Sequence, residues 1–219
     1  SQYPEYDVIV VGAGASGIVA IKRMLEHNPK QKICILESGS LEANPKIDQL
    51  DLFESQQGAF NLSQSRARYV GGKSNLWDGR LINLEPEELD NWPIKRTVLD
   101  EYINQALEVL GVPKKDIKNI LAKANKVMTN DALGRLLSHQ LMPSVAFFAP
   151  LTKVFGLHDL DEWQLRASKN IDLYLHANVE TISLNDDASS VAKVNVHDTL
   201  RKFEKLQIFK AKKVLLATG

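Results

Sequence analysis

The sequence predicts an α/β fold in which a parallel sheet carries an antiparallel β-meander and a helical insertion. An apolar strand at 6–11 leads through glycines into a helix-compatible segment at 15–27 and a second apolar run at 32–37. This order is typical of a βαβ unit, whose two strands are parallel. The last predicted strand, 213–217, is nearly all apolar, as expected in the buried middle of a parallel sheet.

The turn after the first strand carries a G-x-G-x-x-G motif. Gly12 permits a tight turn, Gly14 lets the backbone approach a phosphate, and Gly17 lets the helix pack closely on the strand. Such a strand, turn and helix hold the pyrophosphate of a dinucleotide at the helix N-terminus. The motif therefore predicts a Rossmann-like nucleotide site.

An acidic residue at the end of the second strand supports this interpretation. Glu37 lies 20 residues after Gly17, the spacing at which a carboxylate binds the ribose hydroxyls. A carboxylate there favours a free ribose 2′-hydroxyl over a 2′-phosphate. An ordinary βαβ turn that binds no ligand remains the alternative at this point.

The remaining elements follow from periodicity and from turn residues. Pro29 ends the first helix, residues 38–65 are expected to run over the edge of the site, and Pro86 opens a helical turn at 86–90. Helices are expected at 97–110, 114–127 and 130–140, and strands at 171–176, 179–184, 191–198, 202–210 and 213–217. Residues 141–170 show no clear period.

Charge and hydropathy exclude several classes of protein. Lys+Arg and Asp+Glu both number 27, so no overall positive field attracts nucleic acid or an anionic membrane. No apolar run approaches the roughly 20 residues needed to span a bilayer, and the first residues lack the pattern of a signal peptide. A cytoplasmic protein without nucleic-acid or membrane partners is expected.

Metal and thiol chemistry are not expected. The one cysteine, Cys34, lies in the second predicted strand, where a small buried hydrophobe is the usual role. The five histidines are scattered without ligand spacing. They are His27, His139, His158, His176 and His197.

A second glycine-rich segment lies at 68–79. Its two adjacent glycines allow positive φ angles or a close approach of the backbone. Ser74 and Asn75 add hydrogen-bonding groups, and Trp77 adds a flat apolar surface. The segment is either part of a ligand site or a surface loop that Trp77 anchors in the core.

Together, these segments resemble the glucose–methanol–choline (GMC) oxidoreductase family. The resemblance rests on the first glycine motif, Glu37, the G-G-x-S segment at 71–74, the W-P pair at 92–93, L-G-V at 110–112, A-x-V-x-x-I at 177–182 and A-x-G at 217–219. The spacing is most similar to the bacterial sugar-dehydrogenase and pyranose-oxidase-like branch. The resemblance implies a discontinuous FAD-binding domain at 1–112 and 171–219, with 113–170 as a helical insertion or the start of a substrate region.

The resemblance also implies which residues bind FAD. Gly12, Gly14, Ala15, Ser16 and Gly17 would contact the pyrophosphate, Glu37 the adenosine ribose with Ser38 beside it, and Val179 the adenine. Gly71, Gly72, Ser74 and Asn75 would lie along the stretch from pyrophosphate to flavin, Trp77 and Asp78 near the isoalloxazine, and Ala217, Thr218 and Gly219 near the phosphates. Arg68 would be a phosphate or flavin partner, or else a solvated surface residue.

The implied activity is oxidation of an alcohol or sugar hydroxyl, with hydride transfer to flavin N5 and a histidine base. The G-G loop has no histidine, so non-covalent FAD is expected. The family's catalytic histidine lies in a C-terminal part that this sequence lacks, so no catalytic residue is assigned. The chain is expected to be a fragment, or to be completed by a second chain.

Two other functions remain open. An NAD-dependent dehydrogenase with two dinucleotides would need another G-x-G-x-x-G, and none occurs between 40 and 219. A non-catalytic FAD-binding subunit with a regulatory or assembly role is the third hypothesis, because a fold does not dictate a function.

Overall fold

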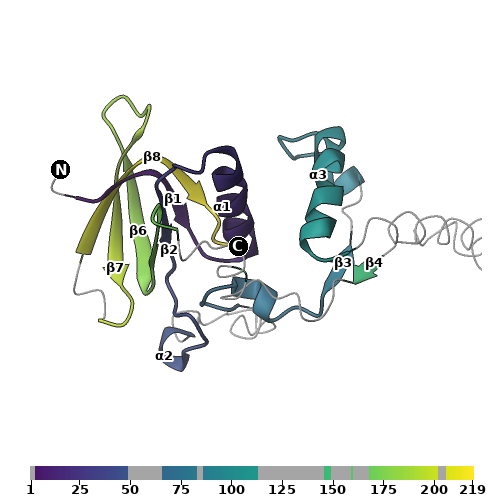
Figure 1. Cartoon of the computed structure of the whole chain (residues 1–219), viewed down its shortest axis with the longest axis horizontal. Coiled ribbons are helices and arrows are strands. Elements are labelled where there is room, and N and C mark those ends of the chain that lie inside the picture. Colours follow the sequence, from purple (N-terminus) through teal and green to yellow (C-terminus); the bar gives the residue numbers. More distant parts are fainter. Residues whose placement is uncertain are drawn as a thin grey trace, which may run out of the picture. The chain divides into compact units, whose positions relative to one another are not determined.

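The computed structural model describes residues 3–48, 66–82, 86–112, 146–148, 159, 168–201 and 206–219. Contacts divide the chain into two compact units, which Figure 1 shows as a ribbon. The first unit comprises Ser1–Leu76 and Val154–Gly219, and the second comprises Trp77–Lys153. This grouping places 77–112 in the second unit. The predicted FAD-binding domain (1–112 and 171–219) and the predicted insertion (113–170) are defined by function. Grouping by contacts does not test such a division, so it stays a prediction.

The first unit contains a six-stranded mixed sheet in the order β5-β2-β1-β8-β7-β6. Its strands are β1 (Glu5–Val11), β2 (Ile33–Leu36), β5 (Ile171–Tyr174), β6 (Ala177–Leu184), β7 (Val191–Asp198) and β8 (Leu206–Leu216). The first four in the sheet order are parallel, and β8, β7 and β6 form an antiparallel meander. The predicted fold class, a parallel sheet with an antiparallel meander, is confirmed.

Strand β8 pairs with different neighbours along its length. Residues 206–209 pair antiparallel with β7, and residues 210–216 pair parallel with β1. The prediction of two strands at 202–210 and 213–217 was therefore wrong. Lys210 and Lys212 are exposed while Ala211 between them is buried, so the period of a strand continues through the predicted break.

Two layers pack on the parallel strands. Figure 1 shows α1 (Ala15–His27) on one side of them and the meander on the other. The core between strands and meander includes Ile9, Cys34 and Val194, all fully buried, and Phe209. The Phe209 ring makes an edge contact with Tyr174, with centroids 4.9 Å apart. Apolar strand residues thus hold the layers together by burial.

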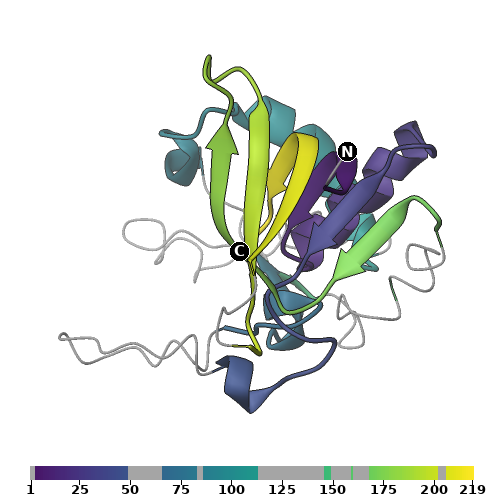
Figure 2. The ribbon, with the colours of Figure 1, turned by 90° about the vertical axis from the view of Figure 1, so that its left-hand side faces the viewer.

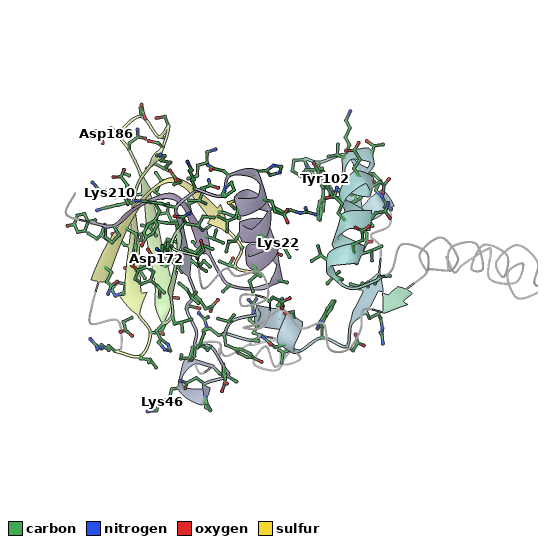
Figure 3. The ribbon with its side chains drawn as sticks, in the orientation of Figure 1. Lys22, Lys46, Tyr102, Asp172, Asp186 and Lys210 are labelled. Atoms are coloured by element: carbon green, nitrogen blue, oxygen red, sulfur yellow. The ribbon has the colours of Figure 1, made fainter. Side chains whose placement is uncertain are left out.

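Two residues connect β5, at one edge of the sheet, to β6, at the other. This short link is possible because the sheet curls, so that β6 begins beside the end of β2, where the Ala177 amide donates to the Glu37 carbonyl at 2.8 Å. His176 in the link has a φ of 57°, a left-handed conformation that is uncommon outside glycine. In Figure 2 the meander faces the viewer, and Figure 3 labels Asp186 in the turn after β6.

The second unit contains an antiparallel pair and a helix. Strand β3 (Arg80–Ile82) pairs with β4 (Ala146–Phe148), and the 3-10 helix η4 (Pro86–Leu89) precedes α3 (Arg96–Val109). Leu107 and Val112 form a small core. The predicted helix 97–110 and turn 86–90 are confirmed. The predicted helices at 114–127 and 130–140 lie outside the described residues.

Two short helices complete the first unit. The helix α2 (Pro45–Asp48) lies within the predicted excursion 38–65, of which 49–65 falls outside the described residues. The 3-10 helix η3 (Gly72–Asn75) lies within the second glycine segment. None of the helices in the described ranges is both long enough and apolar enough to cross a membrane.

Candidate functional site

An open cavity of about 470 Å³ lies where β1, β2 and β8 end and α1 begins. This volume is within the roughly 300–1,000 Å³ usual for ligand pockets. Most predicted site residues line it, namely Gly12, Gly14, Ala15, Ser16, Glu37, Ser38, Arg68, Gly71, Gly72, Ser74, Val179, Ala217, Thr218 and Gly219. The carboxyl ends of parallel strands are the usual place for a ligand in an open α/β sheet.

The three glycines of the first motif differ in why the fold needs a glycine at that position. Gly12 has a φ of 100°, and a Cβ there would lie 2.5 Å from the Ala217 carbonyl oxygen. A Cβ on Gly17 would lie 2.2 Å from the Gly12 carbonyl oxygen. Both glycines are therefore required by packing within the chain, and Gly17 supports the turn without lining the cavity.

Gly14 lines the cavity but is not required by packing. A Cβ on Gly14 would meet no atom within 4 Å, and its φ of −76° and ψ of 178° suit any residue. Because Gly14 lines the cavity, we take this open space to adjoin the cavity. The absence of a side chain therefore leaves room for a group that approaches the backbone closely, as a diphosphate does.

The first turn of α1 faces this space without a competing anion. Gly14 is the N-cap and makes no side-chain capping bond, and the first turn contains no acidic residue. The first amides of a helix have no partner within the helix, and together with the helix dipole they favour an anion. Ala15 and Ser16 of this turn line the cavity. The geometry fits a phosphate group.

Glu37 lines the cavity beside the glycine turn. The Glu37 residue is 6% exposed, and its carboxylate accepts the Ala13 amide at 2.9 Å through Oε2 and the Gly39 amide at 2.8 Å through Oε1. The carboxylate thus connects the glycine turn after β1 to the turn after β2. An ionised carboxylate has about four acceptor positions, so Glu37 can still accept ribose hydroxyls.

The second glycine segment packs against both turns. The Gly71 amide donates to the Ala13 carbonyl at 2.8 Å. A Cβ on Gly39 would lie 1.8 Å from the Arg68 carbonyl oxygen, so the backbones touch there. Gly71 and Gly72 have φ angles of 95° and 54°, which glycine adopts readily. The segment therefore forms a third wall of the cavity.

Some predicted residues do not line the cavity. The Asn75 side chain donates to the carbonyls of Val70 at 3.0 Å and Gly72 at 2.9 Å, so it stabilises the loop. Trp77 and Asp78 belong to the second unit. Their predicted place beside the isoalloxazine stays a prediction.

Several residues that line the cavity are not predicted by the sequence motifs. They are Val11, Leu36, Arg66, Ala67, Lys73, Ala177 and Asn178. Arg66 and Lys73 join Arg68, so three cationic side chains line the cavity against one carboxylate, that of Glu37. This excess of positive charge suits a diphosphate. In the sequence, only the proximity of Arg66 and Lys73 to the G-G pair marks these two residues as candidates.

The thiol and the described histidines lie elsewhere. Cys34 is fully buried, and burial raises the pKa of its thiol. His27 ends α1, His176 lies in the β5–β6 link, and His197 Nε2 lies 2.6 Å from a carboxylate oxygen of Glu180. His139 and His158 are outside the described residues. Within the described part of the chain, no cluster of three or more His, Cys, Asp or Glu could hold a metal ion.

Comparisons with known proteins bear on the fold. No family model matches the chain. A segment of 42 residues, 19% of this chain, is 45% identical to 7% of an alcohol dehydrogenase [acceptor] from Pseudomonas putida. Pyridoxine 4-oxidase from Mesorbium loti matches with a TM-score of 0.57 and 16% identity, covering 98% of this chain and 49% of its own.

Two further solved structures match at similar levels. Formate oxidase from Aspergillus oryzae, solved in a study of its FAD modification, has a TM-score of 0.54 and 16% identity over 97% of this chain and 45% of its own. The FrdA chain of E. coli quinol fumarate reductase has a TM-score of 0.51 and 17% identity over 100% of this chain and 33% of its own.

These likenesses support an FAD-binding fold like that of GMC oxidoreductases. They do not single out the sugar-dehydrogenase and pyranose-oxidase-like branch. The chain spans about half or less of the length of the solved structures it matches.

Proposed function

We propose that this chain is the FAD-binding portion of a GMC-type flavoprotein that oxidises an alcohol or sugar hydroxyl. The observation that carries the proposal is the side-chain space at Gly14, which adjoins the cavity and lies at the first turn of α1. The adjacent positive charge and the buried Glu37 carboxylate suit the two halves of an ADP group.

Each wall of the cavity would hold one part of the cofactor. The first amides of α1 and the Lys73 ammonium would bind the diphosphate. Glu37 would accept hydrogen bonds from the ribose hydroxyls. The Val179 backbone would hold the adenine. Binding is non-covalent in this proposal, because the G-G loop has no histidine to attach a flavin.

Bound flavin would supply a hydride acceptor at N5. The role of this chain is to position that group by its ADP half. None of the three described histidines lines the cavity. We assign the catalytic base, as the family resemblance implies, to a segment outside this sequence or to a second chain. The substrate class, an alcohol or a sugar, and a cytoplasmic location are parts of the proposal.

Titration of the purified 219-residue chain with FAD, FMN and NAD in a calorimeter tests the binding step. FAD should bind with a Kd in the micromolar range or below, and FMN, which lacks the adenosine, should give no measurable heat. NAD should bind more weakly than FAD. No heat with FAD would overturn the proposal, and tighter binding of NAD would favour the dehydrogenase.

Acid precipitation of the FAD-loaded protein tests the mode of attachment. The expected result is a colourless pellet and a yellow supernatant, because nothing covalent holds the flavin. A yellow pellet would contradict non-covalent binding.

Dye reduction with sugars and alcohols tests the oxidation. The 219-residue chain should be inactive when alone, and activity should appear when any downstream coding segment is expressed with it. Full activity of the 219-residue chain alone would refute the assignment of the base.

A further inference from the structure

The turn between β7 and β8 contacts the segment that follows β2. The Thr199 hydroxyl donates to the Ser38 carbonyl oxygen at 3.0 Å. The Thr199 amide donates to the His176 carbonyl oxygen at 2.9 Å. Thr199 itself does not line the cavity. One residue of the meander therefore connects two segments at the proposed adenosine end of the site.

The Ser38 carbonyl and the Gly39 amide belong to one planar peptide unit. On one side this unit accepts the Thr199 hydroxyl, and on the other it donates to Glu37 Oε1 at 2.8 Å. A rotation of the plane would break both bonds together. The Thr199 hydroxyl therefore stabilises the orientation in which the Gly39 amide holds the Glu37 carboxylate.

The close packing at Gly39 leaves no room for a side chain, and without a side chain the backbone is free to rotate. A hydrogen bond such as that from Thr199 is therefore needed to fix the orientation of this peptide unit. A Cβ on Gly39 would lie 1.8 Å from the Arg68 carbonyl oxygen, and a glycine gives the backbone more freedom than any other residue. The Ser38 amide, on the preceding peptide unit, has no acceptor among the residues that the structure describes, and Ser38 lines the cavity. The segment thus offers a ligand the Glu37 carboxylate and the Ser38 amide.

We propose that Thr199 is a positioning residue for recognition of the adenosine ribose. Its hydroxyl fixes the peptide unit between Ser38 and Gly39, which in turn orients the Glu37 carboxylate toward the ribose hydroxyls. This inference rests on the proposed function, since it assigns the ribose to Glu37.

The test measures binding of ADP and of 2′-deoxy-ADP to the whole chain by calorimetry. The wild-type chain should prefer ADP by about tenfold, because 2′-deoxy-ADP leaves a carboxylate acceptor unpaired. Thr199→Val removes the hydroxyl and keeps the shape, and it should reduce this preference to about twofold or less. Thr199→Ser retains the hydroxyl and should keep the wild-type preference.

Thr181→Val is a matched control in the same meander. The Thr181 hydroxyl accepts a hydrogen bond from the Asn195 side chain at 2.7 Å, and unlike the Ser38 partner of Thr199, Asn195 does not line the cavity. This variant should keep the preference for ADP.

If Thr199→Val does not fold, Thr199→Ala takes its place. Exchange of the Gly39 amide hydrogen in the ligand-free variant should then be faster than in the wild type.

The outcomes separate the two proposals. If ADP does not bind the wild-type chain, the proposed function fails. If the wild-type chain prefers ADP while Thr199→Val shows the same ratio as Thr199→Ser, the ribose assignment stands and the role of Thr199 is refuted. Unchanged exchange of the Gly39 amide in a variant without the hydroxyl would refute that role as well.

Discussion

Replacement of Gly14 by alanine separates ligand binding from folding at the first turn of α1. Gly14 has φ and ψ angles that alanine adopts without strain, and a Cβ there meets no atom within 4 Å. Alanine is a poorer N-cap than glycine by up to about 1 kcal/mol, but it lowers the entropy of the unfolded chain, which stabilises by about 0.4–1 kcal/mol. The free energy of unfolding should therefore change by less than about 0.5 kcal/mol.

The same methyl group would occupy the space proposed for the diphosphate. It would displace the phosphate from one or two amides of the first turn, at about 1.5–3 kcal/mol for each charged hydrogen bond. A total loss of about 3 kcal/mol corresponds to a roughly hundredfold increase in the Kd for FAD.

Calorimetry with FAD and urea unfolding of the ligand-free chain measure the two effects. Gly12→Ala is the control, because its φ of 100° and a Cβ 2.5 Å from the Ala217 carbonyl oxygen should lower the free energy of unfolding by about 2 kcal/mol or more. If Gly14→Ala binds FAD with the wild-type Kd, no diphosphate lies on this turn.

Three further changes have definite expected outcomes. Glu37→Gln replaces one carboxylate oxygen by an NH2 group, which faces the Ala13 or the Gly39 amide and cannot accept its hydrogen bond. The free energy of unfolding in urea should therefore fall by about 2–4 kcal/mol, and an unchanged midpoint would contradict the hydrogen bonds at Glu37. The Lys212 ammonium, 2.7 Å from Asp7, holds the pKa of that carboxyl below its ordinary value. This contribution to stability is present above about pH 3.9 and is lost as the pH falls through the lowered pKa. The advantage of the wild type over Asp7→Asn in urea unfolding should therefore be larger at pH 6 than at pH 2, and an advantage independent of pH would refute the pairing. Phe209→Ala removes a side chain that is 2% exposed and should cost about 3–5 kcal/mol by the same assay; a cost below 1 kcal/mol would show that the meander does not pack through this ring.

Local patterns predicted the first unit well. The helix at 15–27 and the strand at 191–198 match the structure as predicted, because each has one apolar periodicity and a clear stop. The strand at 202–210 failed because β8 changes partner between residues 209 and 210. A change of neighbour leaves no mark on a period-2 pattern, and Lys212-Lys213 resembles a polar break.

The site could be predicted where spacing alone defines the chemistry. Gly14 and Glu37 follow from the order of strand, turn and helix. Lys73 and Asn178 occupy variable positions of the motifs at 71–74 and 177–182, and Arg66 lies just before the G-G pair, so no motif specifies these residue types. Their roles depend on tertiary packing, which periodicity does not encode.

The double pairing of β8 has a consequence for synthesis on the ribosome. Val10 pairs with Ile35, which follows it closely in the sequence, but its other neighbour is Leu215, near the end of the sequence. The nascent chain must therefore carry an open, apolar edge on β1 until residues 206–216 leave the exit tunnel, and closing so long a loop is slow. A ribosome that stalls before residue 206 presents that edge to other nascent chains, which makes β1 the segment that chaperones must protect.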